Sequence, residues 1–131
     1  MTIYFGKVVQ MKVLLQSESA SFEAELNRSP AAMVIGGKLP LSSEVNTWGD
    51  EIYFDIGISC PRDGQTMEVR VGDIGYWPEG KCLCVFFGPT PASSGADPAP
   101  ASPVVIVGKT DAAVELLRSI RAGEKITISA A

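Results

Sequence analysis

Residues Gly72–Pro91 read Gly-Asp-Ile-Gly-Tyr-Trp-Pro-Glu-Gly-Lys-Cys-Leu-Cys-Val-Phe-Phe-Gly-Pro-Thr-Pro, and this stretch decides the fold. Two largely apolar runs, Ile74–Trp77 and Lys81–Phe87, flank the turn-forming triplet Pro78-Glu79-Gly80. This arrangement predicts a β-hairpin. Both faces of the segment Cys82–Phe87 are apolar, so we expect that strand to be covered on both sides.

Several segments on either side of the hairpin also have strand-like patterns. In Glu44–Ile58 the apolar residues Ile52, Phe54 and Ile56 fall on one face of the predicted strand. In Thr66–Val71 the residues Met67, Val69 and Val71 are expected to point inward. Further strands are predicted at Val8–Leu15, Val104–Val107 and Lys125–Ser129. Seven or eight short strands are typical of a barrel or a sandwich.

Two short helices are predicted between these strands. The first begins at Ser17 or Ser19, runs through Asn27, and carries Phe22 and Leu26 four residues apart on one side. The pair Ser29-Pro30 is expected to end it, because the residue before a proline avoids the helical region.

The second helix is predicted from Thr110 or Asp111 to Arg121, with Gly123 as its stop. A mobile loop is predicted at 89–103, a segment that contains five prolines. The whole chain, 1–131, is expected to form a single domain, as its length indicates.

The composition argues against several classes of partner and location. The net charge is −4 and there is no basic block, so nucleic acid is not an expected partner. No apolar run approaches the length of a membrane span, and no secretory leader is recognisable. We therefore expect a cytoplasmic protein that does not interact with membranes.

The chain contains no histidine, which removes the commonest general base and the commonest metal ligand. The three cysteines, Cys60, Cys82 and Cys84, are expected to be buried free thiols, with a partial metal site as the alternative. Gly108-Lys109-Thr110 lacks the upstream glycine of a phosphate-binding loop, because Pro103 occupies that position. No metal or cofactor is expected.

Four motifs carry a resemblance to a known family. They are Val45–Phe54, Val71–Pro78, Phe86-Phe87-Gly88 with Thr90-Pro91, and Val107-Gly108-Lys109. In order and spacing they resemble the small prokaryotic cyclophilin-like proteins of the Thermotoga type, from about Val8 to the C-terminus. The resemblance implies a mainly β fold, a closed eight-stranded β-barrel with a helix covering an open end.

The resemblance implies less about activity. True cyclophilins are prolyl isomerases with a catalytic arginine, a Phe-His-Arg run and an Asn-Gly-Ser-Gln-Phe-Phe run. Neither run occurs here, and only Phe86-Phe87 matches the end of the second. Arg62 and Arg70, the arginines of the central region, lie outside any cyclophilin motif. No catalytic residue is therefore assigned.

In the cyclophilin architecture the binding pocket lies on the outside of the barrel, and the resemblance places a candidate ligand site there. The candidate ligand-binding residues are Trp48, Glu51, Tyr53, Tyr76, Trp77, Phe86 and Thr90. The alternatives are that the aromatics form core or oligomer contacts and that Glu51 and Tyr53 lie on a solvated exterior.

Three functional hypotheses follow. The first is binding of a peptide or small ligand in an exterior aromatic groove, with prolyl isomerase activity weak or absent. The second is a non-enzymatic structural or interaction protein, with a homodimer formed through the apolar strand Cys82–Phe87. The third is an unrelated small-molecule enzyme that uses Glu51 and Tyr53.

Overall fold

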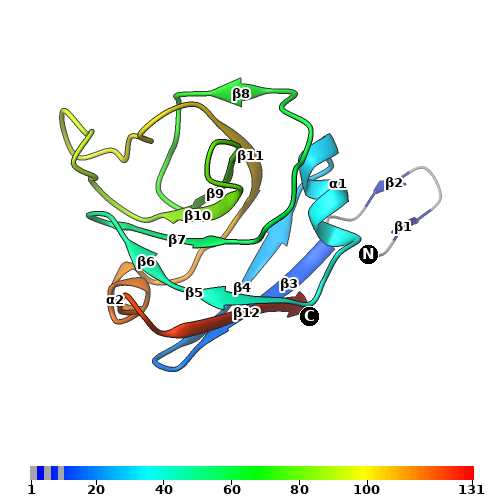
Figure 1. Ribbon diagram of the computed structural model, residues 1–131, viewed down its shortest axis with the longest axis horizontal. Helices are drawn as coiled ribbons and strands as arrows, with labels where there is room; N and C mark the ends of the chain where they lie inside the picture. Colours follow the sequence, from blue (N-terminus) through cyan, green and yellow to red (C-terminus); the bar gives the residue numbers. More distant parts are fainter. Residues whose placement is uncertain (1–2, 5–6, 9–10) are drawn as a thin grey trace.

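An antiparallel β-sheet dominates the computed structural model (Figure 1), which describes residues 3–4, 7–8 and 11–131. Its described strands are β3 (Met11–Ser17), β4 (Ser21–Leu26), β5 (Leu41–Glu44), β6 (Asn46–Thr47), β7 (Glu51–Asp55), β8 (Gln65–Thr66), β9 (Asp73–Trp77), β10 (Cys82–Phe86), β11 (Val104–Lys109) and β12 (Lys125–Ala130). The helices are α1 (Pro30–Gly36) and α2 (Val114–Arg118), and β1 (Ile3–Tyr4) pairs with β2 (Lys7–Val8) in a separate ribbon. Neither helix is long and apolar enough to span a membrane.

The prediction of a closed eight-stranded barrel is wrong. The described sheet has ten strands in the order β5-β12-β3-β4-β11-β9-β10-β7-β6, with β8 paired to β11, and no ladder joins β5 to β6. Yet these two edge strands are separated in the sequence by Val45 alone. The sheet therefore curls until its edges meet (Figure 1). Val45 forms no ladder between β5 and β6, because its N–H donates to the Glu124 carbonyl and its carbonyl accepts the Gly123 N–H.

The predicted helix at 17–27 is also wrong, because this segment forms the turn and second strand of a β3–β4 hairpin. The Ser17 backbone N–H donates to the Ala20 carbonyl over 2.8 Å and tightens the turn. Phe22, Ala24 and Leu26 are buried. Their two-residue period is that of a strand with one face in the core. Strand β3 itself confirms the later part of the predicted strand 8–15, whose Val9 lies outside the described residues.

Ser29-Pro30 begins a helix instead of ending one. The Ser29 hydroxyl accepts a hydrogen bond from the Ala32 backbone N–H over 3.2 Å, so Ser29 is the N-cap of α1. Pro30 occupies the first turn, where the missing N–H of proline costs nothing. Ala31, Ala32 and Ile35 form the buried side of the helix.

The segment Thr66–Val71 is not the predicted inward-facing strand. Of the three residues predicted to point inward, Val69 is buried, in the second apolar cluster of the structure. Only Gln65–Thr66 is strand, and the side chains of Met67 and Val71 are 51% and 52% exposed. Asp73 is the reason, because its carboxylate accepts the Arg70 N–H over 2.8 Å and its own N–H donates to the Arg70 carbonyl. This local turn ends at Gly72 with φ of +93° and replaces the ladder hydrogen bonds.

The hairpin predicted at 74–87 is confirmed as β9 and β10, with Cys82 opposite Trp77 and Val85 opposite Ile74. Every residue of β10 is buried. Leu83 and Val85 face the main core, whereas Cys82, Cys84 and Phe86 belong to a second apolar cluster on the other face of the sheet. The expectation that this strand is covered on both sides is therefore confirmed.

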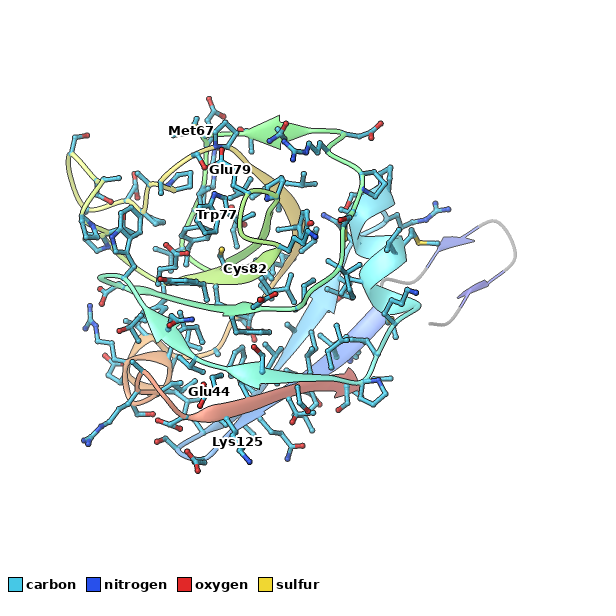
Figure 2. The ribbon with its side chains drawn as sticks, viewed as in Figure 1. Glu44, Met67, Trp77, Glu79, Cys82 and Lys125 are labelled. Carbon is cyan, nitrogen blue, oxygen red and sulfur yellow. The ribbon has the colours of Figure 1, made fainter. Side chains whose placement is uncertain are left out.

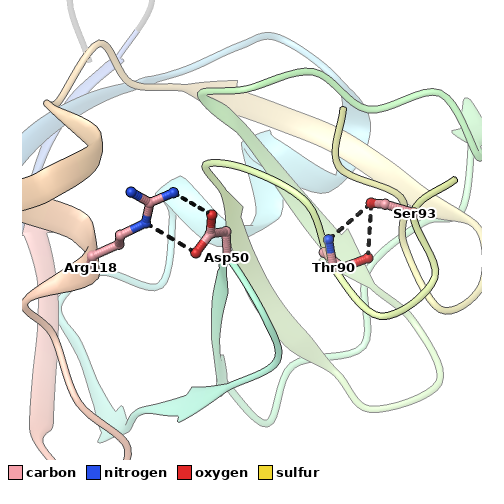
Figure 3. Close-up of polar contacts among 4 residues, drawn as sticks. All are labelled: Asp50, Thr90, Ser93 and Arg118. Atoms are coloured by element: carbon pink, nitrogen blue, oxygen red, sulfur yellow. Dashed lines mark hydrogen bonds and ion pairs between the residues drawn. The ribbon is translucent and has the colours of Figure 1, made fainter. Parts of the chain in front are cut away.

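Helix α2 is shorter than the predicted 110–121 helix. The Thr110 hydroxyl donates to the Glu23 carbonyl and accepts the Ala112 N–H, so this residue ties down the preceding loop instead of starting the helix. Arg118 of α2 forms a two-pronged ion pair with Asp50, with Nη2 lying 2.7 Å from Oδ2 (Figure 3). The ion pair attaches α2 to the turn between β6 and β7.

Candidate functional site

Strands β7, β10 and β9 share an outer face that faces away from the main core. In the register of these strands, Glu51 lies opposite Phe86 and Tyr53 opposite Cys84. Trp77 of β9 lies opposite Cys82. Because alternate residues of a strand point to the same side, all of these side chains share the outer face.

Gly75 leaves room for the large side chains on this face. A Cβ atom built there would lie 3.2 Å from Val104 Cβ and 3.3 Å from Phe86 Cε2. The missing side chain therefore lets the Phe86 ring and Val104 meet across β9. Any larger residue at this position would push one of them away.

The loop between β10 and β11 covers part of the outer face. The Trp77 indole N–H donates to Ser102 Oγ over 2.6 Å. Earlier in the loop, the Thr90 N–H donates to Ser93 Oγ over 2.9 Å (Figure 3), and the Thr90 hydroxyl donates to the Ala99 carbonyl. The bond from Trp77 to Ser102 holds the loop against the sheet, and the bonds of Thr90 fix the shape of the loop itself.

A pocket of about 230 Å³ lies between the outer face and this loop. Its walls are Trp48, Glu51, Tyr53, Trp77, Cys84, Phe86, Pro100, Ala101 and Val104. The rings of Tyr53 and Trp77 stand nearly perpendicular, with an interplanar angle of 82° and centroids 6.5 Å apart. Figure 2 shows Trp77 and Cys82 projecting into the region between β10 and the covering loop.

Five of the seven candidate ligand residues line this pocket: Trp48, Glu51, Tyr53, Trp77 and Phe86. Tyr76 points into the core, where its hydroxyl donates to the Ile58 carbonyl over 2.7 Å and accepts the Cys60 N–H. Thr90 is buried inside the covering loop and uses its hydroxyl there.

The sequence reasoning missed four wall residues, Cys84, Pro100, Ala101 and Val104. Cys84 could have been predicted from the sequence, because it lies two residues from Phe86 in the same strand and its side chain therefore points to the same face. Pro100 and Ala101 reach the pocket only through the path of the covering loop, for which no local pattern exists. Val104, at the start of β11, reaches it through the pairing of β11 with β9.

A sequence model of the family described as cyclophilin-like matches residues 11–129. The chain belongs to the cyclophilin-like family. The solution structure of a hypothetical protein from Archaeoglobus fulgidus is similar to it, with 35% sequence identity and a TM-score of 0.78 over 94% of this chain and 96% of that one. A comparison with curated proteins found no match.

In this cyclophilin-like chain Glu51 is buried, with 5% of its surface exposed, which corrects the expectation of a solvated exterior. Burial raises the pKa of Glu51 to about 7, and a hydrogen bond with the Cys84 thiol acts in the opposite direction. A carboxyl group with such a pKa exchanges its proton near neutral pH. Near that pH it serves as a hydrogen-bond donor in one form and as a negative charge in the other.

The cysteines of this family member are free thiols, and Cys82 and Cys84 are buried. Burial raises the pKa of Cys84 well above its usual range, and it raises the pKa of Cys82 to about 11. Both thiols therefore stay protonated and are poor nucleophiles. Among the described residues, no group of three or more cysteine, aspartate or glutamate side chains is arranged to hold a metal ion.

Proposed function

We propose that this cyclophilin-like chain is a binding module whose outer pocket takes a small ligand or one side chain of a bound peptide. The pocket itself carries the proposal, because it joins an apolar aromatic lining to one buried carboxyl group. Such a combination of apolar walls and few polar groups is typical of ligand sites. The volume is below the roughly 300–1,000 Å³ of sites for drug-sized ligands, which favours a compact group.

The same proposal holds that prolyl isomerase activity is weak or absent. An isomerase must lower a barrier of about 18–20 kcal/mol, which it does chiefly by stabilising the twisted amide with a fixed donor. In cyclophilins this donor is an arginine. None of the wall residues in the described part of the chain is an arginine, and the polar groups there belong to Glu51, Tyr53 and Cys84.

Tryptophan fluorescence tests the binding proposal directly. The chain has two tryptophans, Trp48 and Trp77, and both line the pocket, so emission reports on this site alone. We expect a saturable change in emission when the protein is titrated with a proline-containing tetrapeptide or with small apolar alcohols and amines.

A variant that fills the pocket supplies the control. Ala101→Phe places a ring at the pocket wall and should abolish the response. Ala92→Phe adds the same ring to an exposed position of the same loop and should leave the response unchanged. If no probe gives a saturable change, or if Ala101→Phe responds like the unaltered protein, the binding proposal is wrong.

A protease-coupled assay on proline peptides tests the statement about isomerase activity. We expect no rate above the uncatalysed background at micromolar protein. A clear rate that Ala101→Phe abolishes would make the protein an enzyme acting at this pocket.

A further inference from the structure

Glu51 is a buried acidic group without a basic partner. Among the described residues the single ion pair joins Asp50 to Arg118, so no lysine or arginine neutralises Glu51. Its neighbours in the pocket wall are Tyr53 on the same strand and Cys84 on β10. A buried carboxylate is costly unless a positive charge or several hydrogen bonds compensate it. The pocket therefore lacks a counter-charge of its own.

The aromatic part of the pocket wall can attract a cation through cation–π interactions. Trp48, Tyr53, Trp77 and Phe86 bring four aromatic rings to one small cavity. The Trp77 N–H is already used by Ser102, so this ring offers a ligand only its π system. The perpendicular arrangement of Tyr53 and Trp77 forms two adjoining walls. Aromatic faces attract organic cations, and quaternary ammonium groups are bound in such cages.

Building on the proposed binding function, we infer that the ligand carries a quaternary or methylated ammonium group. The aromatic walls surround its methyl groups, and the Glu51 carboxylate supplies the counter-charge. A cavity of about 230 Å³ holds such a head group, while the remainder of the ligand extends past Pro100 and Ala101. The ligand class is thus a small organic cation or a methylated lysine side chain.

Proton release provides a signature that separates this ligand class from neutral ones. The titratable groups that face Glu51 are the phenol of Tyr53 on β7 and the thiols of Cys84 and Cys82 on β10. Burial raises the pKa of both thiols, so they stay protonated near neutral pH. A bound cation favours the ionised form of Glu51, whose pKa of about 7 leaves it largely protonated at lower pH. Affinity for a cation must therefore rise with pH until the carboxyl is fully ionised. A neutral ligand that accepts a hydrogen bond from the protonated carboxyl shows the opposite trend.

The test compares choline with 3,3-dimethylbutan-1-ol, a neutral molecule of the same shape, by calorimetry and tryptophan fluorescence. We expect choline to bind more tightly than the alcohol. We also expect its affinity to be at least about tenfold higher near pH 8 than near pH 5.5, because at the lower pH binding must displace about one proton from Glu51. Glu51→Gln should weaken choline binding about tenfold or more and remove its pH dependence. Glu23→Gln, at an exposed position of β4, should change neither.

The outcomes separate the two proposals. If the alcohol binds as tightly as choline, or if choline affinity is constant or falls with rising pH, the cation inference is wrong and the binding module stands. If choline binds equally well to Glu51→Gln, the inference is also wrong. If neither these two probes nor the tetrapeptide and apolar fragments perturb the tryptophans, both proposals fail.

Discussion

Ser102 Oγ accepts the Trp77 indole N–H over 2.6 Å, and this one contact joins β9 to the loop that covers the pocket. The two residues lie 25 positions apart in the sequence. Because Trp77 also meets Tyr53 edge to face, the bond fixes the position of two walls of the pocket at once.

Ser102→Ala should therefore loosen Trp77 with a modest loss of stability. Loss of one partly buried hydrogen bond is expected to cost about 0.5–1.5 kcal/mol in chemical denaturation. In a Trp48→Phe background only Trp77 emits, and its quenching by acrylamide should increase. Ser93→Ala removes a bond elsewhere in the same loop and should leave this quenching unchanged.

Gly80 fixes the other side of the same ring. A Cβ atom at this position would lie 2.5 Å from Trp77 Cζ3, so Gly80→Ala must displace the indole. We expect a loss of about 1–3 kcal/mol, as for other overpacked sites, together with a shift in the emission of Trp77. Gly95→Ala is the matched control, because nothing lies within 4 Å of its added Cβ. Equal effects of the two substitutions would contradict the steric explanation.

Glu51 makes the stability of the protein depend on pH. Its pKa in the folded state, about 7, is above that of an unfolded glutamate, so folding favours the protonated form. The stabilisation that comes from protonated Glu51 is fully present below the pKa of Glu51 in the unfolded chain, and it is lost as the pH rises through the folded-state pKa of about 7. Glu51→Gln should match the unaltered protein near pH 4 and exceed its stability near pH 8 by about 1–3 kcal/mol, a range reduced for solvent screening.

Urea denaturation of both proteins at several pH values measures this difference. Comparing the two proteins removes the contributions of all other titrating groups. A constant difference across the pH range would show that the Glu51 carboxyl does not exchange its proton where we expect.

Glu124 should show the opposite pH dependence. Burial tends to raise its pKa, but hydrogen bonds from the Arg121 N–H and from the Ser19 hydroxyl and N–H outweigh burial and lower the pKa. The contribution of Glu124 to stability is therefore present above the pKa of this group in the unfolded chain. It is lost as the pH falls through the lower pKa that Glu124 has in the folded protein. Glu124→Gln should cost about 1–2 kcal/mol near pH 7 and much less in acid, measured by denaturation at each pH.

The sequence predicted those parts of the fold in which local signals agree. Pro78-Glu79-Gly80 between two apolar runs leads directly to the β9–β10 hairpin. At 21–26 the signals conflicted, because Phe22 and Leu26 satisfy both a four-residue and a two-residue period. The intervening Ala24 favours the strand, and pairing with β3 decides between them. At 66–71 the turn made by Asp73 overrides a pattern that is otherwise typical of a strand.

The site was predictable to the extent that it depends on which side chains of a strand point to the same face of the sheet. Glu51 and Tyr53 lie two residues apart in β7, and Glu51 is paired with Phe86 of β10. Trp77 is paired with Cys82, four residues before Phe86 in β10, so all four side chains share one face. The burial of Glu51 was not predictable in this way. Glu51 lies in a pocket whose wall is completed by Pro100 and Ala101 of a loop that begins more than thirty residues later, at 87–103, and that is anchored by the bond from Trp77 to Ser102.

The junction at Val45 has a consequence for how the molecule meets other chains. It holds together the two edges of the sheet, and these edges are only four and two residues long. Long exposed edges are the sites at which sheets from different molecules add to one another, and short edges resist this. The curled sheet should therefore resist edge-to-edge aggregation, so that any partner must recognise side chains and not the backbone of an open strand.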